Sequence, residues 1–103
     1  MIKNLQKINL IEADKRINLY CPIGKDYYTA DATIKFVPDK YYMDYIDLDQ
    51  YLNRLSGLSL TIEEAAKDIY EELQLYAPVQ TKVTIEAFSN THLHVKVTKG
   101  DDI

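Results

Sequence analysis

The sequence lacks most of the features that would assign it to a class at sight. It has a single cysteine, so no internal disulfide can form, as is usual for a reducing compartment. No apolar run approaches the roughly 18 residues of a membrane-spanning helix. The N-terminus Met1-Ile2-Lys3-Asn4 has no apolar signal-peptide core. A glycine-rich phosphate loop, a G-x-S-x-G elbow and a Rossmann fingerprint are also missing. We therefore expect a soluble cytoplasmic protein.

The sequence also lacks an excess of positive charge. Its 12 Lys and Arg stand against 16 Asp and Glu, so any contact with nucleic acid would have to be local. The 103 residues are 47% hydrophobic and 27% charged, which predicts one globular domain over 1–103. Within it, 1–14 is a poorly defined segment and 99–103 a tail. Nine tyrosines suit an interface and weakly indicate oligomerisation.

Four segments alternate apolar and polar residues with a period of two, which predicts strands. The first ends at Cys21-Pro22, and Ser89-Asn90 is the predicted hairpin turn between the last two. The segments are 16–20, 29–36, 83–87 and 93–97.

Two helices are predicted between these strand pairs. Asp47 followed by Gln50 is a capping-box pattern and starts a short helix that ends near Gly57. Thr61 with Glu64 is a second capping box, whose apolar stripe continues to Ala77-Pro78. The element order is ββααββ, an α+β domain.

Cys21 and Glu63 are the candidate functional residues, and the residues alone leave their roles open. Cys21 is filler, metal ligand or nucleophile, and nearby Lys25 would favour a thiolate. Glu63 in a first helical turn either complements the helix dipole or accepts hydrogen bonds from the amidine-like edge of a purine or pterin.

A metal site is not expected. His92 and His94 share a strand face, but zinc needs a third and usually a fourth ligand. Asp44, Asp47 and Asp49 lack the glycine and closing glutamate of a calcium loop.

Four features together resemble the single-module form of 7-cyano-7-deazaguanine reductase. They are Cys21-Pro22, the strand end Phe36-Val37-Pro38-Asp39, the 48–52 helix and Glu63, which follows Cys21 by 42 positions without a gap. The resemblance covers about residues 16–98 and implies a tunnelling fold of four antiparallel strands backed by two helices. It also implies a homo-oligomeric ring, a pentamer or a decamer of two pentamers, with active sites between neighbours.

The resemblance implies roles for individual residues. Cys21 would attack the nitrile carbon and form a covalent thioimide, while Glu63 would bind the deazaguanine edge. Asp44 stands where the family has a substrate-binding glutamate.

The resemblance breaks down at the proton-handling positions. Tyr28 replaces the family's aspartate, so we place it among the substrate-binding residues, and Ile62 replaces a histidine. Asp26 and Asp31 are then the candidates for a displaced catalytic proton carrier.

The stretch after Asp44 decides between branches of the family. The reductases have a serine- and lysine-rich run there that contacts the nicotinamide cofactor, whereas 44–50 has no cation, so no cofactor is expected. The shorter relatives are amidinotransferases that form archaeosine in tRNA. Our first hypothesis is such an enzyme of queuosine or archaeosine biosynthesis, acting on a 7-deazaguanine, free or within tRNA. The alternatives are a non-catalytic purine- or pterin-binding protein and an NADPH-dependent reductase with a divergent cofactor site.

Overall fold

The computed structural model of the chain describes residues 1–88 and 93–103, so the predicted Ser89-Asn90 turn and His92 lie outside the described residues. Among those residues, no helix has the length and apolar character needed to cross a membrane. The elements are β1 (Ile2–Lys3), β2 (Ile11–Cys21), β3 (Asp26–Val37), β4 (Tyr41–Tyr42), α1 (Tyr45–Leu55), α2 (Ile62–Gln74), β5 (Gln80–Phe88) and β6 (His94–Gly100).

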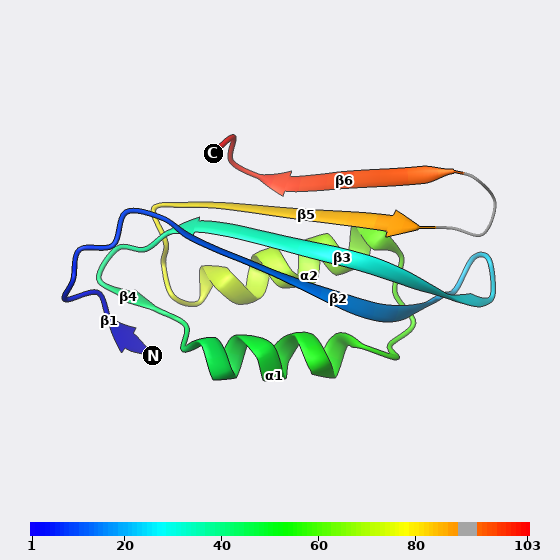
Figure 1. The fold of residues 1–103 in the computed structure, drawn as a ribbon, viewed down its shortest axis with the longest axis horizontal. Helices are drawn as coiled ribbons and strands as arrows, with labels where there is room; N and C mark the ends of the chain where they lie inside the picture. The colour runs from blue at the N-terminus through cyan, green and yellow to red at the C-terminus, as the bar shows by residue number, and fades with distance from the viewer. Residues whose placement is uncertain (89–92) are drawn as a thin grey trace.

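Four strands form an antiparallel sheet in the order β2-β3-β5-β6, and β1 pairs with β4 in a separate two-stranded sheet. α1 packs against β2, and α2 packs against β5 and β6. Both helices cover one face of the sheet, here called the helix face (Figure 1). The predicted α+β class and the ββααββ order are confirmed, with the short strands β1 and β4 added to it.

The core lies between the helix face and the two helices. Strand alternation turns every second residue toward the helices, so Leu19 of β2, Ile34 of β3 and Ile85 of β5 are fully buried. Ile69 of α2 is also fully buried against them.

The first helix begins earlier than predicted. Asp44, not Asp47, is its N-cap, because the Asp44 carboxylate accepts the Ile46 N–H at 2.7 Å and the Asp44 carbonyl accepts the Leu48 N–H at 2.9 Å. Both aspartates are suitable caps, and the chain enters the helix as soon as it leaves β4. The predicted capping box of α2 is confirmed.

The N-terminal segment is more ordered than predicted, because β2 begins at Ile11 and Ile2 pairs with Tyr42. The sequence pattern fails at Lys15, which occupies a helix-face position where an apolar residue is expected. Its amine forms an ion pair with Asp49 of α1 instead, which accounts for the interrupted alternation.

β6 runs to Gly100, so the first two residues of the predicted 99–103 tail belong to the sheet. Asp101 N–H donates to the Thr81 carbonyl at 2.7 Å, and the Asp101 carboxylate accepts the Thr81 N–H at 3.0 Å. Gly100 has φ +112°, and a Cβ there would overlap the Thr81 carbonyl oxygen. Close approach of two backbones therefore requires glycine at this position.

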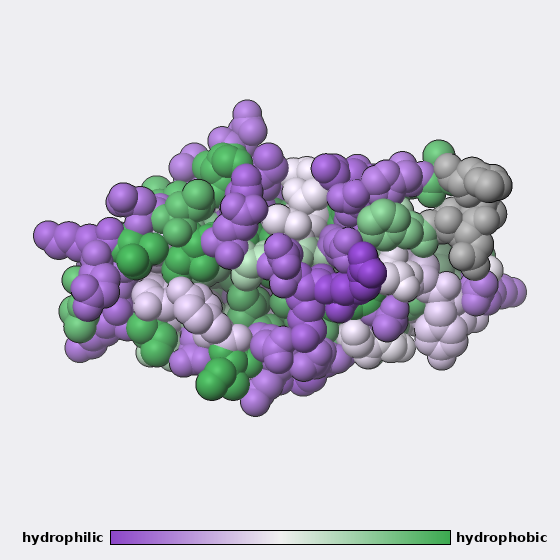
Figure 2. All heavy atoms as spheres, viewed as in Figure 1, coloured by the Kyte–Doolittle hydropathy of each residue, from purple (hydrophilic) through white to green (hydrophobic). Residues whose placement is uncertain are grey.

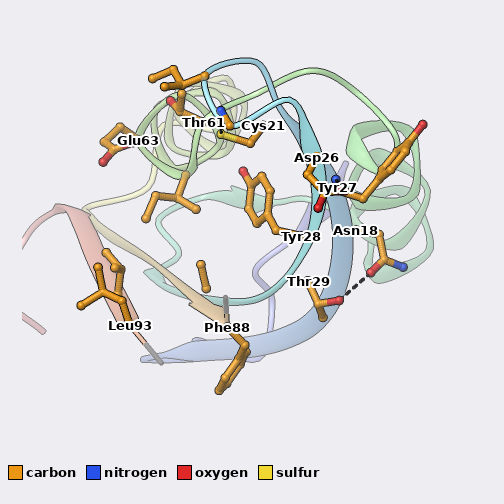
Figure 3. Close-up of a pocket in the computed structure, with 15 residues that line it drawn as sticks. Asn18, Cys21, Asp26, Tyr27, Tyr28, Thr29, Thr61, Glu63, Phe88 and Leu93 are labelled. Atoms are coloured by element: carbon orange, nitrogen blue, oxygen red, sulfur yellow. Dashed lines mark hydrogen bonds between the residues drawn. The ribbon is translucent and has the colours of Figure 1, made fainter. Parts of the chain in front are cut away.

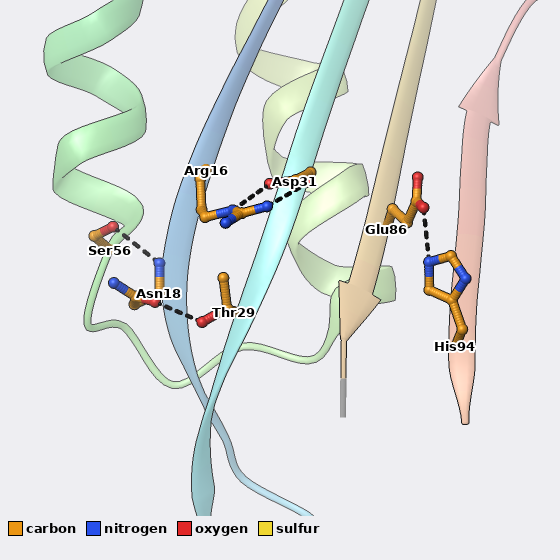
Figure 4. A network of polar contacts seen from close by, with 7 residues as sticks. All are labelled: Arg16, Asn18, Thr29, Asp31, Ser56, Glu86 and His94. Carbon is orange, nitrogen blue, oxygen red and sulfur yellow. Dashed lines mark hydrogen bonds and ion pairs between the residues drawn. The ribbon is translucent and has the colours of Figure 1, made fainter. Parts of the chain in front are cut away.

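The other face of the sheet, here called the outer face, is polar. A cross-strand ion pair links Arg16 with Asp31, and the His94 ring contacts the Glu86 carboxylate at 2.7 Å (Figure 4). Lys96 forms a second ion pair with Glu86. Polar side chains cover the middle of this face, whereas apolar side chains gather at the end that holds the N-terminal segment (Figure 2). The outer face therefore has no apolar layer packed on it within the described residues.

Candidate functional site

A cavity of about 880 Å³ lies at one end of the sheet. Five element ends meet there: the exit of β2, the start of β3, the N-terminus of α2, the end of β5 and the start of β6 (Figure 3). The lining residues are Asn18, Cys21, Ile23, Gly24, Asp26, Tyr27, Tyr28, Thr29, Thr61, Ile62, Glu63, Ala87, Phe88, Leu93 and Val95.

Cys21 is the last residue of β2 and has a free, partly exposed thiol. The turn 22–25 folds back over it, and Lys25 closes the turn with φ 54° and an N–H bond of 2.8 Å to the Cys21 carbonyl. Gly24 N–H donates to the Cys21 sulfur at 3.3 Å. A backbone donor thus points at the atom that carries negative charge when a thiol acts as a nucleophile. Lys25 does not line the cavity.

Asp26 is the residue directly opposite Cys21 in the β2–β3 register. Opposite residues share a face of the sheet, with Cβ atoms about 4.5–5.5 Å apart. The Asp26 carboxylate accepts its neighbour's Tyr27 N–H at 2.8 Å, and both residues line the cavity. Asp26 and Cys21 are therefore opposite residues of the sheet that both line the cavity.

Glu63 enters the cavity from the first turn of α2. Its neighbour Glu64 is committed to the capping box, in which its carboxylate accepts the Thr61 N–H and its own N–H donates to the Thr61 hydroxyl, both at 3.1 Å. Glu64 does not line the cavity. Of these two adjacent glutamates, one holds the helix and the other is available to a ligand.

Tyr28 forms part of the cavity wall, and its hydroxyl donates to the Leu60 carbonyl at 2.6 Å. Burial, followed by the charges of Cys21, Glu63 and Glu64, raises the pKa of Tyr28 to about 12. The hydroxyl therefore remains protonated near neutral pH.

The structure does not bring Asp31 and Asp44 to this cavity. Asp31 is an odd-numbered residue of β3 and so points to the outer face, where the Arg16 guanidinium holds the pKa of the Asp31 carboxyl below its ordinary value. Asp44 caps the N-terminus of α1, whereas it is the C-terminal end of that helix that leads toward the cavity.

Sequence reasoning missed the rest of the lining. Phe88 ends β5 and stacks on His94 with ring centroids 4.9 Å apart, and Arg16 lies over the same Phe88 ring. Thr29 is the residue of β3 directly opposite Phe88, and its hydroxyl donates to the Asn18 amide oxygen at 3.0 Å. A phenylalanine at a strand end was the available signal for Phe88, but only the register brings Asn18, Thr29 and Phe88 to one cavity.

Few residues could ligate a metal ion or bind the phosphates of a cofactor. The described residues contain no group of three or more His, Cys, Asp or Glu that could hold a metal ion. Helix α1 has an acidic residue, Asp47, in its first turn and a basic residue, Arg54, in its last turn. A cation that could bind phosphate therefore lies at the C-terminal end of this helix.

Comparison with known proteins identifies a solved structure with the same fold. No protein-family model matches this sequence, and no curated protein matches it. Among solved structures, the chain has the tunnelling fold that the sequence resemblance implied. The matching structure is the archaeosine synthase QueF-Like in the apo form, with a TM-score of 0.85 and 20% sequence identity. The match covers 90% of this chain and 93% of that one, so the resemblance is confirmed as a resemblance of fold.

Proposed function

We propose that the chain is an amidinotransferase-like enzyme that forms a thioimide between Cys21 and a 7-deazaguanine nitrile. The observation that carries this proposal is that Cys21 and Glu63, 42 positions apart in the sequence, line one cavity. A nucleophile and a carboxylate on separate rigid elements are the two groups that such a reaction needs. The fold shared with an archaeosine synthase supports the proposal.

The reaction has two halves at Cys21. The thiolate adds to the nitrile carbon, one electron pair of the C≡N bond moves to nitrogen, and that nitrogen takes a proton to give the thioimide. Ammonia then adds to the same carbon, and the C–S bond breaks to release the amidine and return the thiolate. Asp26 is opposite Cys21 in the sheet register and is our proposed proton carrier, in preference to Asp31 on the outer face.

Glu63 anchors the substrate in this proposal. A carboxylate can accept two parallel hydrogen bonds from the amidine-like edge of a deazaguanine ring. Because Glu64 is occupied as a cap, Glu63 has both oxygens available for the ligand. Asp44 lies outside the cavity of its own subunit, so a binding role for it requires presentation by a neighbouring subunit.

A ring assembly fits the topology. The sheet order leaves β2 and β6 as edges. The backbone of β2 pairs with residues 57–60 at Asn18 and Tyr20, and within the described part of the chain the rest of its edge is open to another strand. Open edge strands are a liability that closure removes. We propose that subunits join through these edges into a pentamer or decamer. Native mass spectrometry that finds a monomer at micromolar concentration would contradict this.

The test is an adduct measurement. The protein is incubated with 7-cyano-7-deazaguanine, free and as the base within tRNA, and its intact mass is recorded beside a Cys21→Ala control. We expect an adduct on the wild-type protein that forms without NADPH, and no nitrile-dependent loss of NADPH absorbance. Addition of ammonia should release the adduct as the amidine. NADPH oxidation that depends on the nitrile would establish the reductase alternative instead.

A non-catalytic ligand-binding protein is the second candidate, and Tyr28 is the observation that favours it. A tyrosine with its hydroxyl proton bound to Leu60 replaces the family's proton-handling aspartate. Such a protein would bind the deazaguanine equally well after Cys21→Ala and form no adduct. The same mass and binding measurements therefore separate the two candidates.

A further inference from the structure

The connection between α1 and α2 is held by both of the first two long strands. Tyr20 of β2 donates its N–H to the Leu58 carbonyl and accepts the Leu60 N–H, each at 3.0 Å, and Gly57 N–H donates to the Asn18 carbonyl at 2.7 Å. These bonds fix residues 57–60 along the edge of β2. The connection thus reaches α2 already aligned with the sheet.

The last carbonyl before the helix is held from β3. Leu60 precedes the N-cap Thr61, and its carbonyl accepts the Tyr28 hydroxyl at 2.6 Å. Within the described residues, that carbonyl accepts no other hydrogen bond. Tyr28 therefore joins the start of β3, a central strand, to the residue before the N-cap of α2, and Glu63 follows Leu60 by three residues.

The hydrogen bond from Tyr28 to Leu60, here called the tether, lies at the candidate site. The Tyr28 ring lies in the cavity wall between the strand that carries Cys21 and the helix turn that carries Glu63 (Figure 3). A short bond between half-buried groups leaves the helix start little freedom to move relative to β3. The distance between nucleophile and carboxylate then depends on this contact.

We propose that Tyr28 is a positioning residue that sets Glu63 relative to Cys21 through the Leu60 carbonyl. It does not act as the proton donor of the reaction, because its single proton is bound to Leu60. The raised pKa of Tyr28, about 12, agrees with a permanent donor. The part that concerns ligand binding rests on the function proposed above.

A double-mutant cycle tests the positioning role. Binding of 7-cyano-7-deazaguanine is measured by calorimetry in a Cys21→Ala background, which prevents the adduct, for Tyr28→Phe, Glu63→Gln and the pair. We expect Tyr28→Phe to weaken binding about tenfold when Glu63 is present and less than twofold when Glu63→Gln is combined with it. Equal losses in both backgrounds would show that Tyr28 acts independently of Glu63 and would overturn the proposal. Tyr41→Phe, on β4 and outside the cavity lining, is the matched control and should change nothing.

Amide hydrogen exchange tests, without any ligand, whether the tether restrains the first turn of α2. Tyr28→Phe should speed exchange at Glu64 and Ala65 in the first turn of α2 by tenfold or more, and leave Ile69 in the middle of the helix unchanged. Unchanged exchange in the first turn would overturn the tether. If the wild-type protein fails to bind the probe, the proposed function fails, and this measurement still supports or rejects the tether.

Discussion

Replacing Glu63 by glutamine isolates the carboxylate that we assign to ligand recognition. The change keeps the size of the side chain and its position on α2. It turns one acceptor oxygen into an N–H₂ group, which then faces an N–H of the ligand edge. One hydrogen bond to a charged group is lost and a donor is left against a donor.

The expected loss of ligand affinity depends on how well the Glu63 carboxylate is shielded from water. Glu63 is exposed in the isolated subunit. An exposed ion pair is worth about 0.2–1 kcal/mol, whereas a shielded hydrogen bond to a charge is worth about 1.5–3 kcal/mol. With a bound ring over the carboxylate and, in the proposed ring assembly, a neighbouring subunit beside it, we expect a loss of about 2 kcal/mol, or about 30-fold in Kd.

Calorimetry with 7-cyano-7-deazaguanine in the Cys21→Ala background measures this effect, and Glu64→Gln is the control. Glutamine at 64 still offers an oxygen to the Thr61 N–H, so the cap survives and binding should change less than twofold. Circular dichroism should show equal helix content in the two variants. Equal losses of affinity would refute the distinction between the two glutamates.

Three further predictions concern stability, each measured as the free energy of unfolding in urea. Gly100→Ala should cost about 2–4 kcal/mol, since its Cβ overlaps the Thr81 carbonyl, whereas Gly57→Ala, at φ +87° with no atom within 4 Å of its Cβ, should cost only about 1–2 kcal/mol. The Asp31 carboxyl has a lowered pKa in the folded protein, so its stabilising effect relative to Asp31→Asn should be present above pH 3.8 and be lost as the pH falls further. The Tyr28 pKa is raised from 10.0 to about 12, so its contribution relative to Tyr28→Phe should be complete below pH 10 and be lost as the pH rises toward 12.

Each of these predictions has a contrary outcome. Equal losses in the free energy of unfolding for Gly100→Ala and Gly57→Ala would mean that the backbone around Gly100 accommodates a Cβ without strain. An Asp31→Asn difference that is the same at pH 7 and pH 2 would show that the ion pair with Arg16 does not stabilise the fold. A Tyr28→Phe difference that grows between pH 10 and pH 12 would mean that the tyrosinate is favoured in the folded protein.

Local sequence patterns predicted the helices and strands well where one buried face sets the spacing of the apolar residues. The Thr61–Glu64 capping box and the alternation over 29–36 needed no tertiary information, and the structure confirms both elements. The failures have specific causes. Lys15 interrupted the alternation because its partner Asp49 is supplied by a helix 34 residues away. At Asp44 and Asp47, two equivalent caps competed, and the end of β4 selected the first.

The sequence by itself determined the α+β class and the element order, and its resemblance to the reductase family made Cys21 and Glu63 the candidate site residues. Periodicity, capping and spacing are properties of neighbouring residues along the chain, so they can be read without a structure. Only the tertiary structure decided which acids accompany Cys21, because register and strand face depend on partners distant in sequence. The β2–β3 register put Asp26 opposite Cys21, and strand alternation turned Asp31 to the outer face beside Arg16. The position of Tyr28 against Leu60 likewise arises from the packing of the α1–α2 connection on the sheet, which no local pattern in the chain encodes.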